Sequence, residues 1–201
     1  MKRLQFLVVL LTLALVTSLS GQALTDTDRE KLLEHLDITS MNFQNAVAGL
    51  SEEQWNYRAA EGRWTIAEVA EHIAASESLI REMSRGAMAT PASAEMLKEA
   101  RKDDVILARI PDRSSRFQAP EPLKPENRYK TPAGTMEAFR TERAISMKMA
   151  REGGDLRAYA AANPVLGPTD VYGWMLFMSA HVERHTKQIE EVKADPGFPR
   201  T

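Results

Sequence analysis

The chain has 201 residues, of which 43% are hydrophobic and 27% are charged, a composition that suits one globular domain. Its formal net charge of -2 gives no reason to expect nucleic acid or an acidic membrane surface as a partner. Cysteine is absent, which excludes disulfides, thiolate metal ligands and a cysteine nucleophile. A transition metal would therefore depend mainly on histidine or carboxylate side chains.

Residues 1–23 have the three-part layout of a secretory signal peptide: MKR, then the apolar run LQFLVVLLTLALV, then the small and polar TSLSGQA. Gly21 and Ala23 suit the -3 and -1 positions, which predicts cleavage after Ala23. The alternative is an uncleaved anchor, but the dense apolar run is about a dozen residues, shorter than the ~20 that span a bilayer. We expect an exported protein, periplasmic or extracellular, whose remaining domain, residues 24–201, has no stable membrane span.

Helical periodicity dominates this domain, and we expect an all-α fold without strands. Thr27 and Thr65 have capping-box spacing to a glutamate three residues later. Ser51 can cap a further short turn, and Thr169 is expected to cap the last helix. The predicted long helices span about 28–50, 66–86, 133–153 and 170–194, and residues 93–109 also look helical.

Four long amphipathic helices around one core predict a four-helix bundle. Two long connections, residues 110–132 and 155–168, allow neighbouring helices to run in the same direction, so a simple up-down-up-down order is not required. The first connection is rich in proline and long for a loop. Such loops often cover a functional site.

Two of the four histidines lie four residues apart in the sequence HVERH, residues 181–185. Residues at this spacing are about 40° apart around a helix axis, so His181 and His185 project from one face. That face also carries apolar side chains such as Trp174, so it is the core face. His72 lies on the apolar stripe of the second long helix. Three histidines are therefore expected to point into the bundle from two helices.

Buried imidazoles without partners cost roughly 1–3 kcal/mol for each unsatisfied polar group. A divalent metal at about 2.0–2.1 Å would satisfy one nitrogen of each ring, and three protein ligands leave coordination positions open, as in catalytic sites. We therefore predict that His72, His181 and His185 bind a divalent ion, with Zn, Ni, Fe and Mn as candidates. The alternative is that the histidines are packed in the core without a metal.

Other polar residues have simpler interpretations. Glu183 lies about 200° around the helix from His181 and should be solvated, so HVERH is not the HExxH motif of zinc proteases. Glu68 is interpreted as a first-turn carboxylate favoured by the helix dipole, with a role as a base or as a partner of His72 as the alternative. His35 is interpreted as a surface residue. Four basic residues are interpreted as part of a solvated loop and not as a site for an anion: Arg113, Arg116, Arg128 and Lys130.

Two long stretches of the chain resemble the DinB-like family. GLSEEQWNYRAAEGRWTIAEVAEHIAASE has a Leu-Ser-x-x-Gln-Trp entry, then Trp-Thr-Ile, then a helix with one histidine. VLGPTDVYGWMLFMSAHVERHTKQIEEVK looks like the last bundle helix of the family, with its His-x-x-x-His pair. The connection PDRSSRFQAPEPLKP resembles the linker of one branch, and the resemblance covers nearly all of residues 28–195.

The resemblance implies a four-helix bundle of DinB/YfiT type, often dimeric, that commonly binds a divalent metal through three histidines. These histidines match His72, His181 and His185. Related members are thiol-dependent S-transferases or isomerases, and others have been proposed as metal-dependent hydrolases. We therefore expect an exported metalloprotein, in a homodimer, that acts on a small-molecule substrate as a metal-dependent transferase or hydrolase. The alternative is a non-catalytic metal- or ligand-binding helical module.

Overall fold

The computed structural model describes residues 23–100 and 102–200. The predicted signal peptide, apart from Ala23, lies outside these residues, so export stays a prediction. Within the described ranges, no helix combines the length and the apolar character that crossing a membrane requires.

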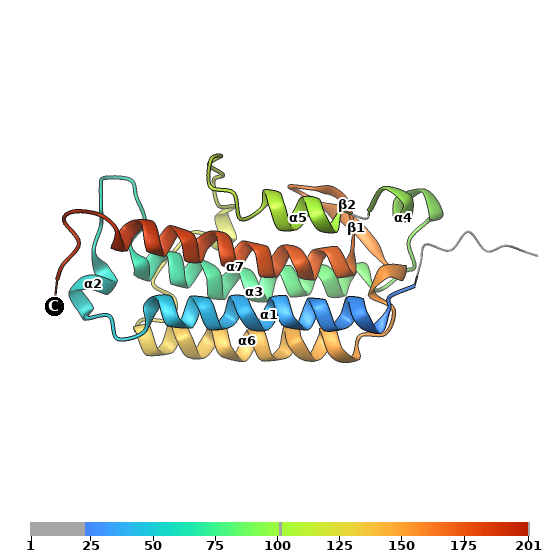
Figure 1. Ribbon diagram of the computed structural model, residues 1–201, viewed down its shortest axis with the longest axis horizontal. Helices are drawn as coiled ribbons and strands as arrows, with labels where there is room; N and C mark the ends of the chain where they lie inside the picture. The colour runs from blue at the N-terminus through green and yellow to red at the C-terminus, as the bar shows by residue number, and fades with distance from the viewer. Residues whose placement is uncertain (1–22, 101, 201) are drawn as a thin grey trace, which may run out of the picture.

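Four long helices lie side by side and form the body of the molecule (Figure 1). Their neighbours in space are α1 with α7, α7 with α3, α3 with α6, and α6 with α1. The colour gradient in Figure 1 shows that α1 and α7 run in one direction and that α3 and α6 run in the other. The predicted four-helix bundle is confirmed, and neighbouring parallel pairs replace a simple up-down-up-down order. The bounds of these helices are Asp26–Val47 (α1), Ile66–Ala87 (α3), Pro132–Glu152 (α6) and Val171–Lys193 (α7).

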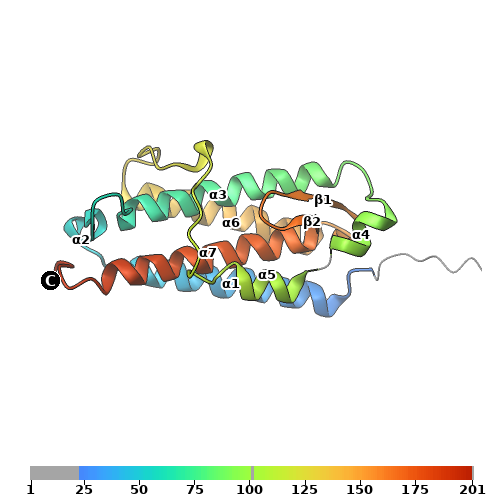
Figure 2. The ribbon, with the colours of Figure 1, turned by 90° about the horizontal axis from the view of Figure 1, so that it is seen from above.

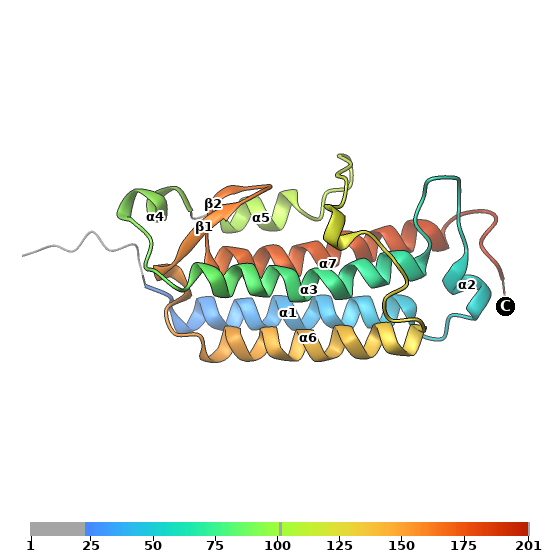
Figure 3. The same ribbon diagram turned by 180° about the vertical axis from the view of Figure 1, so that it is seen from behind.

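Smaller elements lie at both ends of the bundle, with α2 at one end and α4 at the other, and over α7 and α3, as Figures 2 and 3 show. The connection that follows α5 crosses α7 towards α3 (Figure 2), where η1 contacts α3. The segment 93–109, expected to be helical, contains the two short helices α4 and α5. The bounds of the smaller elements are Glu52–Asn56 (α2), Ala94–Ala100 (α4), Asp103–Arg109 (α5), Glu121–Leu123 (η1), Leu156–Ala158 (η2), Ala160–Asn163 (β1) and Gly167–Asp170 (β2).

Capping side chains set the starts of the helices. The predicted capping boxes at Ser51 and Thr65 are both present. The predicted cap at Thr27 is wrong, because Thr25 accepts from the Asp28 backbone N–H while the Asp28 carboxylate accepts from the Thr25 N–H. The predicted cap at Thr169 is also wrong, because the side chain of Asp170 accepts from the N–H of the third helical residue. In both cases a carboxylate takes part in the cap: Asp28 accepts from the N–H of the capping Thr25, and Asp170 itself caps α7.

A two-stranded antiparallel hairpin corrects the expectation of a fold without strands. Ala160 pairs with Asp170 and Asn163 pairs with Gly167. The Asn163 side chain accepts from two N–H groups of the intervening turn, and Gly167 adopts a φ of 73°, in the left-handed region that favours glycine. The hairpin depends on backbone pairing and turn chemistry and lacks the apolar alternation that reveals a strand in a sequence.

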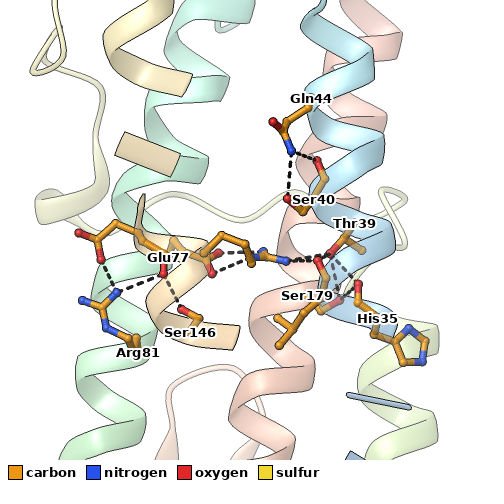
Figure 4. Close-up of polar contacts among 11 residues, drawn as sticks. His35, Thr39, Ser40, Gln44, Glu77, Arg81, Ser146 and Ser179 are labelled. Carbon is orange, nitrogen blue, oxygen red and sulfur yellow. Dashed lines mark hydrogen bonds and ion pairs between the residues drawn. The ribbon is translucent and has the colours of Figure 1, made fainter. Parts of the chain in front are cut away.

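A buried polar network joins all four long helices (Figure 4). Arg143 of α6 donates to both carboxylate oxygens of Glu77 of α3, at 2.7 and 2.8 Å, and these two residues are only 2% and 1% exposed. The same guanidinium donates to the Leu36 carbonyl and to the Thr39 hydroxyl of α1. The Thr39 hydroxyl lies 3.2 Å from the hydroxyl of Ser179 on α7. These contacts form only when the four helices keep the same relative heights.

Candidate metal centre

Three histidine rings from two helices meet at one point. His72 of α3 and His185 of α7 each place Nε2 3.2 Å from Nε2 of His181, also on α7. One nitrogen of each ring lies within 4.8 Å of the others. An ion at about 2.1 Å from two nitrogens, at octahedral or tetrahedral angles, separates them by about 3.0–3.4 Å. The two distances from His181 Nε2 therefore already match the spacing that a shared ion requires.

The packing of α3 against α7 brings the rings together. The two helices run in opposite directions (Figure 1), and their packing places His72 of α3 level with the i, i+4 pair on α7. His72 is 3% exposed and His185 is 9% exposed, whereas His181 is partly exposed. The site is thus mostly enclosed by protein.

Hydrogen bonds at the outer nitrogens of two rings determine which nitrogen carries the proton. His72 Nδ1 lies 3.0 Å from the Leu123 carbonyl oxygen, and His185 Nδ1 lies 2.9 Å from Oε1 of Gln188. Both oxygens can only accept, so each Nδ1 carries hydrogen and each Nε2 of the neutral ring presents a lone pair. Metal-binding histidines are typically oriented by such outer contacts.

His181 cannot satisfy both of its neighbours by hydrogen bonding. Its Nε2 faces two lone pairs, those of His72 and His185, and it has at most one proton to donate. Its Nδ1 has no hydrogen-bond partner within the part of the chain that the structure describes. A cation between the three Nε2 atoms would satisfy all three lone pairs, so the donor set fits a divalent metal.

Burial keeps the three rings neutral. It lowers the pKa of His72, an effect that the hydrogen bond to Leu123 only partly opposes. It also lowers the pKa of His181 and His185 well below the ordinary value for histidine. A protonated ring at this site would be poorly solvated and would lie next to the other two histidine rings, which disfavour a positive charge there. Near pH 7 the rings are therefore in the neutral form that binds metals.

Comparison with known proteins gives the family. The family model of the DinB superfamily matches residues 35–189. The chain belongs to the DinB superfamily. It is 23% identical over 152 residues to the uncharacterized protein YuaE of Bacillus subtilis (strain 168). The aligned region covers 74% of this chain and 89% of YuaE.

The solved structure of YfiT from Bacillus subtilis has a similar fold, with a TM-score of 0.54 at 13% sequence identity. The match covers 90% of this chain and 94% of the YfiT chain. YfiT is described as a probable metal-dependent hydrolase with an unusual four-helix bundle topology. At this level of identity the likeness shows that the two proteins share a fold.

The remaining predicted residues of this DinB superfamily member lie outside the trio. Glu183 forms an ion pair with Lys187, and its side chain is 40% exposed. Glu68 accepts from the Thr65 backbone and from Arg58, which supports the interpretation as a first-turn carboxylate. The side chain of His35 is partly exposed and lines a surface hollow between α1 and α7, apart from the other three histidines.

The four basic residues of the proline-rich connection do not all behave as a solvated loop. Arg116 and Lys130 are exposed, as predicted. Arg113 instead pairs with Glu191 on α7, and Arg128 pairs with the buried Glu71 on α3. This connection also supplies the Leu123 carbonyl, so the prediction that it covers a functional site agrees with its position.

Sequence reasoning missed the groups that hold the histidines. Gln188 lies three residues after His185 and therefore on the same side of α7, a spacing that could have indicated it. The Leu123 carbonyl is a backbone group, so no side-chain pattern identifies it. The ring of Trp64, directly before α3, lies 5.0 Å from the ring of His72.

Proposed function

We propose that His72, His181 and His185 bind one divalent metal ion and that the protein uses this ion to act on a small molecule in a hydrolytic or group-transfer reaction. The observation that carries the proposal is the meeting of three Nε2 atoms at 3.2 Å spacing around His181. The description of YfiT, which shares the fold, as a probable metal-dependent hydrolase adds support. Zn, Ni, Fe and Mn all accept imidazole ligands.

The residues of the chain would prepare the site before the ion binds. The Leu123 carbonyl and Gln188 hold the rings of His72 and His185 with their lone pairs inwards. Burial keeps the ligands neutral, so binding does not have to displace protons near pH 7. Three protein ligands leave positions for a substrate, and the bound ion would supply Lewis acidity to a substrate oxygen or thiolate.

The nature of the substrate follows partly from the predicted compartment. Low-molecular-weight thiols are used mainly in the cytoplasm, whereas residues 1–23 predict export. Hydrolysis of a small ester or amide therefore fits an exported protein better than thiol transfer.

A non-catalytic module that binds a ligand at the metal is the second candidate. Glu68 and Glu71, the two carboxylates on α3 that precede His72, are both occupied by hydrogen bonds from backbone and arginine groups. Neither is free to serve as a general base, and this observation favours the second candidate.

Turnover assays on the metal-loaded protein distinguish the two candidates. We expect loaded protein to hydrolyse small ester or amide probes, and removal of the metal by a chelator to lower the rate on the order of 100-fold or more, since Lewis-acid activation supplies several kcal/mol. Adding back one equivalent of metal should restore the rate, and His181→Ala protein should stay inactive. If fully loaded protein does not turn over esters, amides or thiol acceptors, the result would contradict the proposed enzymatic activity. It would favour the non-catalytic binding module.

A further inference from the structure

The connection between α5 and α6 crosses α7 towards α3 (Figure 2). It is held at its two ends by charged residues of α3 and α7. Glu71 directly precedes His72, and Arg184 directly precedes His185. Both are buried, at 5% and 7% exposed, and both bind backbone groups of the connection. Each end of the connection is thus fixed by the residue next to a candidate metal ligand.

Glu71 holds the second end through three hydrogen bonds. Its carboxylate accepts from the backbone N–H of Glu126 at 2.7 Å, from that of Asn127 at 2.8 Å and from Nε of Arg128 at 2.9 Å. Arg128 also donates from Nη2 to the Lys124 carbonyl at 2.7 Å. The carboxylate and the guanidinium together close this stretch of backbone into one compact loop.

The same loop carries the carbonyl that orients His72. Leu123 accepts from His72 Nδ1 at 3.0 Å, directly before the stretch that Glu71 holds. Asn127 and Lys130 adopt φ values of 59° and 64°, which residues with a Cβ rarely adopt. The loop therefore keeps its shape because Glu71 holds it, and the position of the Leu123 carbonyl depends on that shape.

Arg184 fixes the first end of the connection in a corresponding way. Its guanidinium donates to the backbone carbonyls of Ile110, Asp112 and Ser115. Within this stretch, Arg113 donates from Nη1 to Oε1 of Gln188 at 3.2 Å, the atom that also accepts from His185 Nδ1. Arg184 is therefore linked to the ring of His185 through the connection and Gln188.

We propose that Glu71 and Arg184 are positioning residues that hold the connection so that His72 and His185 keep their Nδ1–H tautomers and present Nε2 to the metal. The proposal rests on the proposed function, because it assigns these residues to the metal centre. Each acts on a different histidine: Glu71 through Leu123 on His72, and Arg184 through Arg113 and Gln188 on His185.

The first test is nitrogen NMR of the histidine rings in metal-free protein, comparing the wild type with Glu71→Gln and Arg184→Lys. We expect the wild type to show Nδ1–H tautomers at both rings. Glu71→Gln should mix the tautomers of His72 and leave His185 unchanged, and Arg184→Lys should do the reverse. Glu68→Gln is the matched control, because Glu68 lies one turn earlier on α3 and bonds to Arg58 and Thr65 instead of the connection.

The second measurement is the dissociation constant for Co²⁺, a probe with a visible spectrum. Loss of an outer contact of a metal ligand typically weakens binding about 10–100-fold, and we expect this range for Glu71→Gln and no change for Glu68→Gln. If Glu71→Gln does not fold, Arg128→Gln removes one of the three bonds to the same carboxylate and should act in the same direction.

The outcomes separate this inference from the proposed function. Unchanged tautomers and Co²⁺ affinity in Glu71→Gln, together with faster amide exchange at Glu126 and Asn127, would overturn the inference and leave the metal site intact. A wild type that binds no Co²⁺ would overturn the proposed function, and with it the assignment of Glu71 and Arg184 to a metal centre.

Discussion

Replacing Arg143 by methionine is expected to lower the free energy of unfolding by about 3–5 kcal/mol, the cost of leaving one partner of a buried ion pair uncompensated. The variant leaves the Glu77 carboxylate at 1% exposure without its two charge-assisted hydrogen bonds. It also removes the donors to the Leu36 carbonyl and the Thr39 hydroxyl. Denaturant unfolding followed by circular dichroism measures the loss.

Two further variants show whether the ion pair is responsible. The double variant Glu77→Leu with Arg143→Met should recover most of the lost stability, because replacing both partners by apolar side chains is often neutral or stabilising. Arg140→Met changes an exposed arginine on the same helix and should shift stability by less than about 0.5 kcal/mol. A double variant as unstable as the single variant would show that another interaction dominates.

Replacing His181 by alanine is expected to reduce the bound metal from one ion per chain to a trace. Its Nε2 lies between those of His72 and His185, so the variant removes the central ligand. The affinity should fall more than about 100-fold, beyond the ~10–100-fold typical of losing an outer contact. Elemental analysis of dialysed protein, with a competing chelator for the affinity, gives both quantities.

The fourth histidine provides the matched control. His35 lies on α1 and lines a surface hollow apart from the trio, so His35→Ala should bind as much metal as the wild type. Equally low metal in the wild type, His181→Ala and His35→Ala would favour the alternative in which the three core histidines are simply packed.

Much of the fold could be predicted because its signals are local. Apolar periodicity identified the long helices, and Ser51 and Thr65 identified helix starts through side chains that bond three residues ahead. The hairpin escaped prediction because β1 consists of three alanines and Asn163, with no apolar alternation. Thr25 and Asp170 were missed as caps because a threonine nearby, Thr27 or Thr169, was also a suitable cap residue.

Sequence patterns could predict only part of the candidate site. The i, i+4 spacing places His181 and His185 on one face, and the apolar stripe places His72 inside the bundle. His72 and His181 are 109 residues apart in the sequence, so whether His72 lies level with the pair depends on the relative heights of α3 and α7, which only tertiary packing determines. Leu123 contributes a backbone carbonyl and Glu71 acts on backbone N–H groups, so neither role has a sequence pattern.

X-ray absorption at the metal edge of loaded wild-type protein tests the central claim most directly, which is that three imidazoles share one cation. The account predicts three histidine nitrogens at about 2.0–2.1 Å, with the remaining positions filled by oxygen ligands. It also predicts that His181→Ala loses the metal, and that any ion still bound at high metal concentration has at most two imidazoles. A spectrum with at most one imidazole, unchanged by that substitution, would contradict the account.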